Sequence, residues 1–99
     1  MPPLRADQVQ KDVGRRISEL RRERGLTQAE LADRASVSTN YVARVETGLQ
    51  NLTLQSLTKL ANLFGLPIHE FFREPADRRV RAGRPPGSGK KRGQPRKRR

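Results

Sequence analysis

With 99 residues the chain has room for one small domain, and because it contains no cysteine and a single histidine, disulfide bonds, thiolate metal sites and paired-histidine zinc sites are excluded. No apolar stretch approaches the roughly 18 residues of a membrane-spanning helix, and the N-terminus lacks the order of a signal peptide, so we expect a cytoplasmic protein. The formal net charge of +12 favours a polyanionic partner, and the modest core favours self-association, since a domain of about 60 residues buries only roughly 60% of its chain surface.

The first seven residues, 1–7, should form a flexible arm. They contain Pro2-Pro3 and show no apolar periodicity. Order should begin near Gln8, because apolar residues then recur at intervals of three or four, at Val9, Val13, Ile17 and Leu20. This spacing predicts an amphipathic helix with one apolar face. Gly25 should end it, since glycine readily adopts the left-handed conformation that follows many helices.

A capping box opens the next predicted helix. The Thr27 hydroxyl and the Glu30 carboxylate, three residues apart, can each accept a hydrogen bond from a free backbone N–H at a helix start. This helix is short and should end near Ala35, with Leu31 and Ala32 also on its buried face.

Ser38 is well suited to cap a third helix. In this helix Val42 and Val45 lie three residues apart and should face inward, and Gly48 supplies the stop. The apolar pattern is therefore broken once, at Ser36-Val37-Ser38, between two short helices.

Two more helices complete the predicted body. Thr53 can cap a fourth, which Gly65 closes and which carries the apolar residues Leu54, Leu57, Leu60, Ala61 and Phe64. Pro67 suits the first turn of a fifth. There we expect Ile68, Phe71 and Phe72 to face inward, although one of the two rings could be exposed.

With almost no strand signal, the chain is predicted to be an all-α domain of five short helices.

The break between the second and third helices has a functional interpretation. Two short helices joined at roughly 90–120° by a tight turn hold the second away from the domain, so that its N-terminal end can enter the major groove of DNA. With Val42 and Val45 anchoring it from beneath, four short or polar residues face outward, namely Thr39, Asn40, Ala43 and Arg44. Arg44 can make a bidentate contact with guanine, and Asn40 can do so with adenine.

The stretch from about Val13 to Phe72 resembles the Xre-type, lambda-repressor-like helix-turn-helix regulators. The residues that carry the likeness are GLTQAELA, then ASVS, then ETG, followed by a capped leucine-rich helix and a closing aromatic pair. The resemblance implies a compact five-helix DNA-binding domain, usually dimeric, that reads two half-sites. The segment NLTLQSLTKLA, with Tyr41, also looks like the restriction-modification controller branch, although general Xre repressors carry such loops too.

The resemblance also implies roles for individual positions. Base-facing positions fall on Thr39, Asn40 and Arg44, with Ala43 beside them. We assign contacts with the DNA backbone to Thr27, Gln28, Ser38, Tyr41, Thr47 and Asn51. Arg21 and Glu46 occupy the places of the family's ion pair between the first and third helices, which we interpret as structural. Ser36 departs from the family, which usually has glycine there, and a left-handed conformation at this residue would cost roughly 1 kcal/mol.

Other interpretations of single residues stay open. Arg44 could be an ordinary solvated arginine, and Gln28 could be a polar residue of a first helical turn. Tyr41 could pack on the domain surface or lie against the sugar-phosphate chain. His69 has no metal-binding or catalytic companion and is interpreted as a surface residue.

Most of the excess charge lies in residues 73–99. This segment has 12 Lys and Arg against 2 acidic residues, a charge of +10, whereas residues 1–72 have 10 against 8, a charge of only +2. Proline, glycine and basic residues dominate it, so we expect a disordered tail. The tail could be a solubilising extension, or it could strengthen DNA binding through counterion release.

Together these features predict a homodimeric, sequence-specific transcription regulator of bacterial or phage type, with residues 8–72 as its DNA-binding domain. The dimer interface is expected on the rim of the fifth helix, at Leu66, Ile68 and Phe72. No catalytic, cofactor or metal site is expected, because no nucleophile elbow, carboxylate pair or phosphate-binding glycine loop is present. Two other functions stay open: an antitoxin or adaptor that binds a protein partner and autoregulates, and a nonspecific nucleic-acid-binding protein driven by the basic tail.

Overall fold

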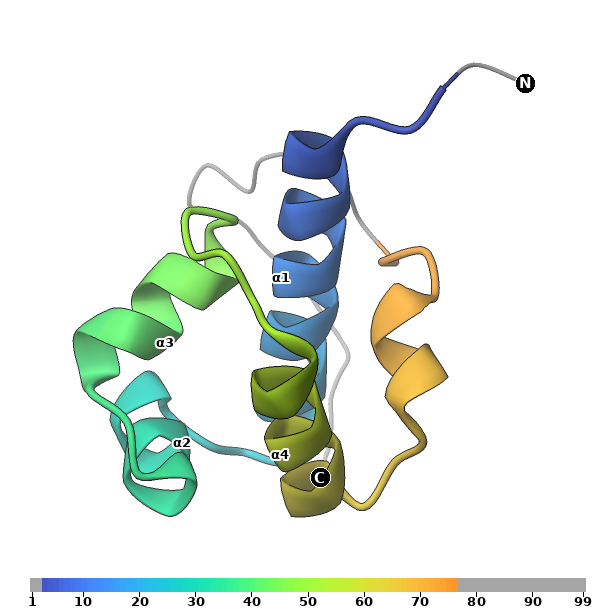
Figure 1. Ribbon diagram of the computed structural model, residues 1–99. Helices are drawn as coiled ribbons and strands as arrows, with labels where there is room; N and C mark the ends of the chain where they lie inside the picture. Colours follow the sequence, from blue (N-terminus) through green and yellow to red (C-terminus); the bar gives the residue numbers. More distant parts are fainter. Residues whose placement is uncertain (1–2, 77–99) are drawn as a thin grey trace, which may run out of the picture.

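The computed structural model describes residues 3–76, which form four α-helices and one 3-10 helix. In chain order these are α1 (Ala6–Glu23), α2 (Gln28–Ala35), α3 (Thr39–Glu46), α4 (Leu54–Phe64) and η1 (Ile68–Phe72). Figure 1 shows α1 in the middle, with α2 and α3 on one side and η1 on the other. This part of the chain contains no strand, so the expected all-α fold is confirmed, and none of its helices is long and apolar enough to cross a membrane. The first two residues and residues 77–99, which hold most of the expected basic tail, lie outside the described residues.

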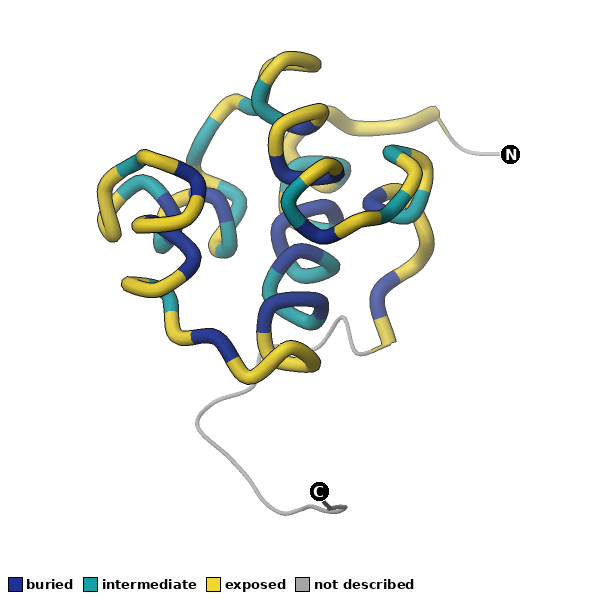
Figure 2. The backbone as a smooth tube through the Cα atoms, turned by 90° about the horizontal axis from the view of Figure 1, so that it is seen from below, coloured by how far each residue is buried: buried dark blue, intermediate teal, exposed yellow. Residues whose placement is uncertain are grey.

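The central helix α1 begins at Ala6, slightly before the expected start at Gln8. Asp7 in its first turn favours this earlier start, because a carboxylate is stabilised at the positive end of the helix dipole. The apolar stripe is buried as predicted, at Val13, Ile17 and Leu20. Figure 2 shows such buried positions facing the interior of the molecule, with exposed positions on the outer faces of the helices.

Gly14 allows α1 to approach the C-terminal end of α3 closely. A Cβ atom at this position would overlap the carbonyl oxygen of Val45 and would press on the backbone of Glu46. The two helices therefore meet backbone to backbone, which brings Glu46 within reach of the side chains of α1.

Both predicted caps of the α2–α3 pair are confirmed. Thr27 Oγ1 accepts a hydrogen bond from Glu30 N at 3.0 Å, while Glu30 Oε1 accepts one from Thr27 N at 2.8 Å. Ser38 Oγ accepts one from Tyr41 N at 3.0 Å. Between the helices Ser36 has φ 57° and ψ 44°, so this non-glycine residue takes a left-handed conformation.

Helix α4 begins after its predicted cap. The Thr53 hydroxyl accepts a hydrogen bond from Ser56 N at 3.0 Å, and Gly65 ends the helix with φ 71°. The buried residues are Leu57, Leu60, Ala61 and Phe64. Leu54, the first residue of this helix, does not join them and is 74% exposed.

The fifth helical segment is a 3-10 helix rather than the expected α-helix. Its five residues, which follow Pro67, are too few for a run of α-type hydrogen bonds. Glu70 N instead donates to Pro67 O at 3.0 Å, which is the shorter 3-10 spacing.

The two rings of η1 face opposite ways. Phe71 is 0% exposed and meets Phe64 edge to face, with ring centroids 6.2 Å apart. Phe72 was also expected to face inward and does not: its side chain is 53% exposed. Consecutive residues of a 3-10 helix point about 120° apart around its axis, and here Phe71 enters the core while Phe72 points toward solvent.

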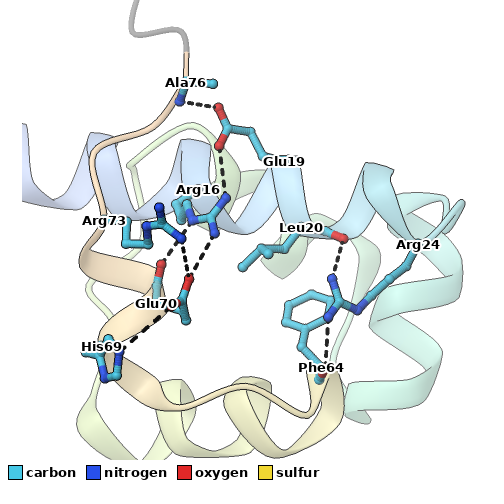
Figure 3. A network of polar contacts seen from close by, with 9 residues as sticks. All are labelled: Arg16, Glu19, Leu20, Arg24, Phe64, His69, Glu70, Arg73 and Ala76. Atoms are coloured by element: carbon cyan, nitrogen blue, oxygen red, sulfur yellow. Dashed lines mark hydrogen bonds and ion pairs between the residues drawn. The ribbon is translucent and has the colours of Figure 1, made fainter. Parts of the chain in front are cut away.

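Polar contacts fasten η1 and the residues after it to α1 (Figure 3). Arg16 Nη2 lies 3.2 Å from Glu70 Oε1, and Arg16 Nε donates to Glu70 O at 3.0 Å. Arg73 Nη1 reaches the same Glu70 oxygen at 3.3 Å. Arg16 also pairs with Glu19, whose second oxygen accepts a hydrogen bond from Ala76 N at 2.7 Å. Hydrogen bonds from Arg73, and less strongly from Arg16, hold the pKa of Glu70 below its usual range.

Candidate nucleic-acid interface

The left-handed turn at Ser36 sets α3 against α2 so that one side of α3 faces the core and the other faces solvent. Val42 and Val45 are buried on the inner side. The outward side carries the four residues expected to read bases, with Thr39, Asn40 and Arg44 exposed and Ala43 half-buried. The structure thus brings these four residues together on one face of one helix, as their spacing requires.

Arg44 rests on the loop that follows α3. Its Nε donates to Gln50 Oε1 at 3.3 Å, and its Nη2 donates to Leu49 O at 3.4 Å. The side chain remains exposed, so the guanidinium is both positioned by the protein and open to solvent.

The same loop is pinned to α1. Gln10 Nε2 donates to Gly48 O at 3.1 Å and to Gln50 O at 3.4 Å. Gly48 has φ 80°, and a Cβ atom there would lie 2.6 Å from Lys11 Cγ. No local sequence pattern pointed to Gln10 or Gln50, because these partners lie 40 residues apart in the chain.

Arg21 and Glu46 form a buried bidentate pair between α1 and α3. Arg21 Nε lies 2.6 Å from Glu46 Oε2, and Arg21 Nη2 lies 3.0 Å from Glu46 Oε1. Arg21 is 8% exposed, and its Nη1 also donates to Leu26 O at 2.6 Å. Gln28 Nε2 donates to Glu46 Oε1 at 3.0 Å, so the first residue of α2 joins the same network. The pair therefore fixes the orientation of both helices of the turn relative to α1.

The remaining residues assigned to the DNA backbone lie around α3. Thr47 is exposed, and its hydroxyl donates to Ala43 O at 3.0 Å or to Arg44 O at 3.2 Å. Asn51 is exposed in the loop after α3, and Thr27 and Ser38 are exposed at the starts of α2 and α3. Ser38 and Thr47 thus lie at the two ends of α3 and Asn51 lies in the loop that follows it, whereas Thr27 lies at the start of α2.

Tyr41 packs on the domain. Its half-buried ring lies against the core, and its hydroxyl donates to Ser56 Oγ at 3.3 Å. The ring helps to line an apolar cavity of about 70 Å³ beneath α3, together with Val37 and Leu60.

The acidic groups beside the α3 face are engaged within the protein. Glu46 is held by Arg21 and Gln28, and Glu30 by its cap. The backbone N–H of Thr27, followed by its hydroxyl, holds the pKa of Glu30 below its usual range. Within residues 3–76, no group of three or more histidine and acidic side chains could hold a metal ion.

The residues expected at the dimer interface lie around η1. Leu66 and Ile68 are partly buried against the core, whereas Phe72 is largely exposed. This segment lies across α1 from α3, as Figure 1 shows.

Comparison with known proteins identifies the family. A helix-turn-helix family model matches residues 17–71. The immunity repressor protein of Bacillus phage phi105 is 39% identical over 56 residues, which cover 57% of this chain and 39% of the phage protein. The HTH-type transcriptional regulator SinR of Bacillus licheniformis is 33% identical over 63 residues, which cover 63% of this chain and 57% of that protein. The chain thus spans only part of the length of these relatives.

Solved structures agree with the family match. The restriction-modification controller protein C.AhdI from Aeromonas hydrophila superposes with a TM-score of 0.65 at 32% identity, covering 70% of this chain and 100% of the controller. The biofilm master regulator SinR, solved in complex with DNA, gives a TM-score of 0.57 at 33% identity over 61% of this chain and 97% of that one. These relatives are transcription regulators, which confirms the expectation that the chain is not an enzyme. The chain belongs to the Xre-type, lambda-repressor-like helix-turn-helix family that its sequence resembles.

Proposed function

We propose that the protein is a sequence-specific DNA-binding transcription regulator that reads the major groove with α3. The observation that carries this proposal is that α3 is buried on one side only. Val42 and Val45 lie in the core, and the candidate base-reading residues lie on the outer side. A helix held in this way fits the major groove, which is roughly 12 Å wide. The relatives support the proposal, since one is a phage repressor and another was solved with DNA.

Base discrimination and backbone positioning fall to different residues in this proposal. Arg44 contacts guanine and Asn40 contacts adenine, while Thr39 and Ala43 lie against neighbouring base edges or methyl groups. The DNA backbone is contacted by the flanking residues Thr27, Gln28, Ser38, Tyr41, Thr47 and Asn51. The Gln28 side-chain amide donates one N–H to Glu46, and its second N–H donates to a phosphate oxygen.

The regulator acts as a homodimer in this proposal, through Leu66, Ile68 and Phe72. Phe72 supplies the exposed aromatic ring that such an interface needs. Because η1 lies across α1 from α3, two copies joined at η1 leave both α3 helices uncovered. A symmetric dimer then reads two half-sites about 34 Å apart, or a multiple of that spacing.

Selection of bound sequences from a random DNA pool tests the proposal. We expect a two-fold symmetric consensus and a preference of roughly 10³-fold or more over random DNA. Equal binding to all sequences would identify a nonspecific nucleic-acid-binding protein instead. A stable co-purifying protein partner, with DNA binding that only autoregulates, would identify an antitoxin or adaptor.

Arg44→Ala tests the base-reading residue directly. On the selected site we expect a loss of about 1–3 kcal/mol in binding free energy and a relaxed preference at one base position. Fluorescence anisotropy on the selected site and on its single-base variants measures both. Arg22→Ala, at an exposed arginine of α1, is the control and should leave the ranking of sequences unchanged. Uniform weakening by Arg44→Ala on all sequences would contradict the base-reading role.

A further inference from the structure

The contacts of Arg44 occupy one edge of its guanidinium group. Nε and Nη2 both donate to the loop after α3, to Gln50 Oε1 and Leu49 O. Because arginine has no acceptor, only the amide oxygen of Gln50 can face it. The position of the Gln50 oxygen therefore determines how this edge of the guanidinium is turned.

A guanidinium has five N–H donors in a planar fork. Nε–H and one Nη2–H point along the edge that the loop occupies. The second Nη2–H and one Nη1–H point in parallel along the end of the group. This free end matches the O6 and N7 acceptors of guanine, which bind arginine in bidentate fashion.

The loop that holds Arg44 is itself held at both ends. Gln10 of α1 binds the carbonyl oxygens of Gly48 and Gln50, while Leu49 N donates back to Arg44 O at 2.8 Å. The close contact with Lys11 leaves no space for a side chain at Gly48. A loop fixed in this way limits the rotamers of Arg44 before any DNA is bound, which lowers the ordering cost of binding.

We infer that Gln50 is a specificity-determining residue and Gln10 its positioning residue: Gln50 orients Arg44 so that its free end meets guanine, and Gln10 keeps the Gln50 backbone in place. The inference rests on the proposed function and adds two residues, one of them on α1, to the apparatus that selects the base. Neither residue needs to contact a base.

Gln50→Ala is the first test, measured on the selected DNA site and on the three variants of the base that Arg44→Ala relaxes. Removing the acceptor should lower the preference for guanine at that position about threefold to tenfold, the range of a single net hydrogen bond. The preferences at other positions and the thermal unfolding midpoint should not change. A merely structural role for Gln50 would instead change the midpoint or weaken every sequence alike.

Gln50→Glu is the rescue variant, since a carboxylate also accepts a hydrogen bond from Arg44. It should retain the guanine preference, although its negative charge should weaken binding to all sequences equally. Gln55→Ala, at an exposed glutamine of α4, is the matched control and should change nothing. Gln10→Ala should relax the same base position as Gln50→Ala, by a smaller factor.

The inference is overturned if Gln50→Ala leaves the guanine preference intact, or if Gln50→Glu loses it to the same extent. A wild-type protein without any sequence preference would defeat the proposed function and the inference together. A selective wild-type protein with an Arg44-dependent base position and an unaffected Gln50→Ala variant would defeat the inference alone.

Discussion

Helix α1 holds its two neighbours in different ways. Towards α3 it offers Gly14, where the backbones touch, and the buried pair of Arg21 with Glu46. On the η1 side the buried ring of Phe71 meets Phe64 of α4, and the polar contact of Arg16 with Glu70 lies nearer to solvent. A bidentate ion pair is directional, whereas apolar burial is not. The orientation of α3 is therefore specified more closely than that of η1, as its proposed role requires.

The largest expected loss of stability comes from a substitution in η1. Phe71→Ala should lower the free energy of unfolding by about 3–5 kcal/mol, because it leaves a cavity at a fully buried position. Phe72→Ala is the matched control and should change stability by less than about 0.5 kcal/mol while weakening self-association. Urea unfolding followed by circular dichroism, with sedimentation analysis, measures both. Equal losses of unfolding free energy in the two variants would show that the Phe71 ring is not what holds η1 in place.

The next largest loss of stability is expected from a substitution in α3. Glu46→Ala should cost roughly 3 kcal/mol of stability, because it leaves the Arg21 charge buried without its partner. Replacing both residues, Arg21→Met with Glu46→Met, should recover most of that loss, since an apolar pair of similar volume avoids the desolvation cost. The double variant should nevertheless bind the selected DNA site less well, because α3 has lost its directional contact. Full DNA affinity in the double variant would show that the orientation of α3 does not depend on the pair of Arg21 with Glu46.

The smallest expected effect is on the loss of stability at acid pH. The folded-state pKa of Glu70 is lowered, so the unfolded chain binds more protons in the acid range. Its contribution is complete above the ordinary glutamate pKa of about 4.3 and is lost as the pH falls through the lowered folded value. Glu70→Gln should therefore show a weaker loss of stability on acidification than the wild type, measured by urea unfolding across that range. Parallel pH curves for the two proteins would show that the polar contacts around η1 do not contribute.

The sequence alone determined the local elements of this protein. The caps at Thr27, Ser38 and Thr53 each join a hydroxyl group to a backbone N–H three residues later in the chain. Capping and turn formation depend on short-range geometry, so these features follow from the order of residues. The same local signals, with the apolar spacing, were enough to predict an all-α helix-turn-helix fold.

Tertiary structure decided which side chains are covered and which polar groups meet. Leu54 and Phe72 follow an apolar pattern and are exposed, because no other part of residues 3–76 lies over them. Gln10 reaches Gly48 and Gln50 only because α1 runs beside the end of α3. Burial and long-range hydrogen bonds depend on neighbours that are distant in the chain, and a periodic pattern does not specify such neighbours. For this reason the positions of the candidate base-reading residues could be predicted from sequence, whereas the contacts between Arg44 and the loop after α3 could not.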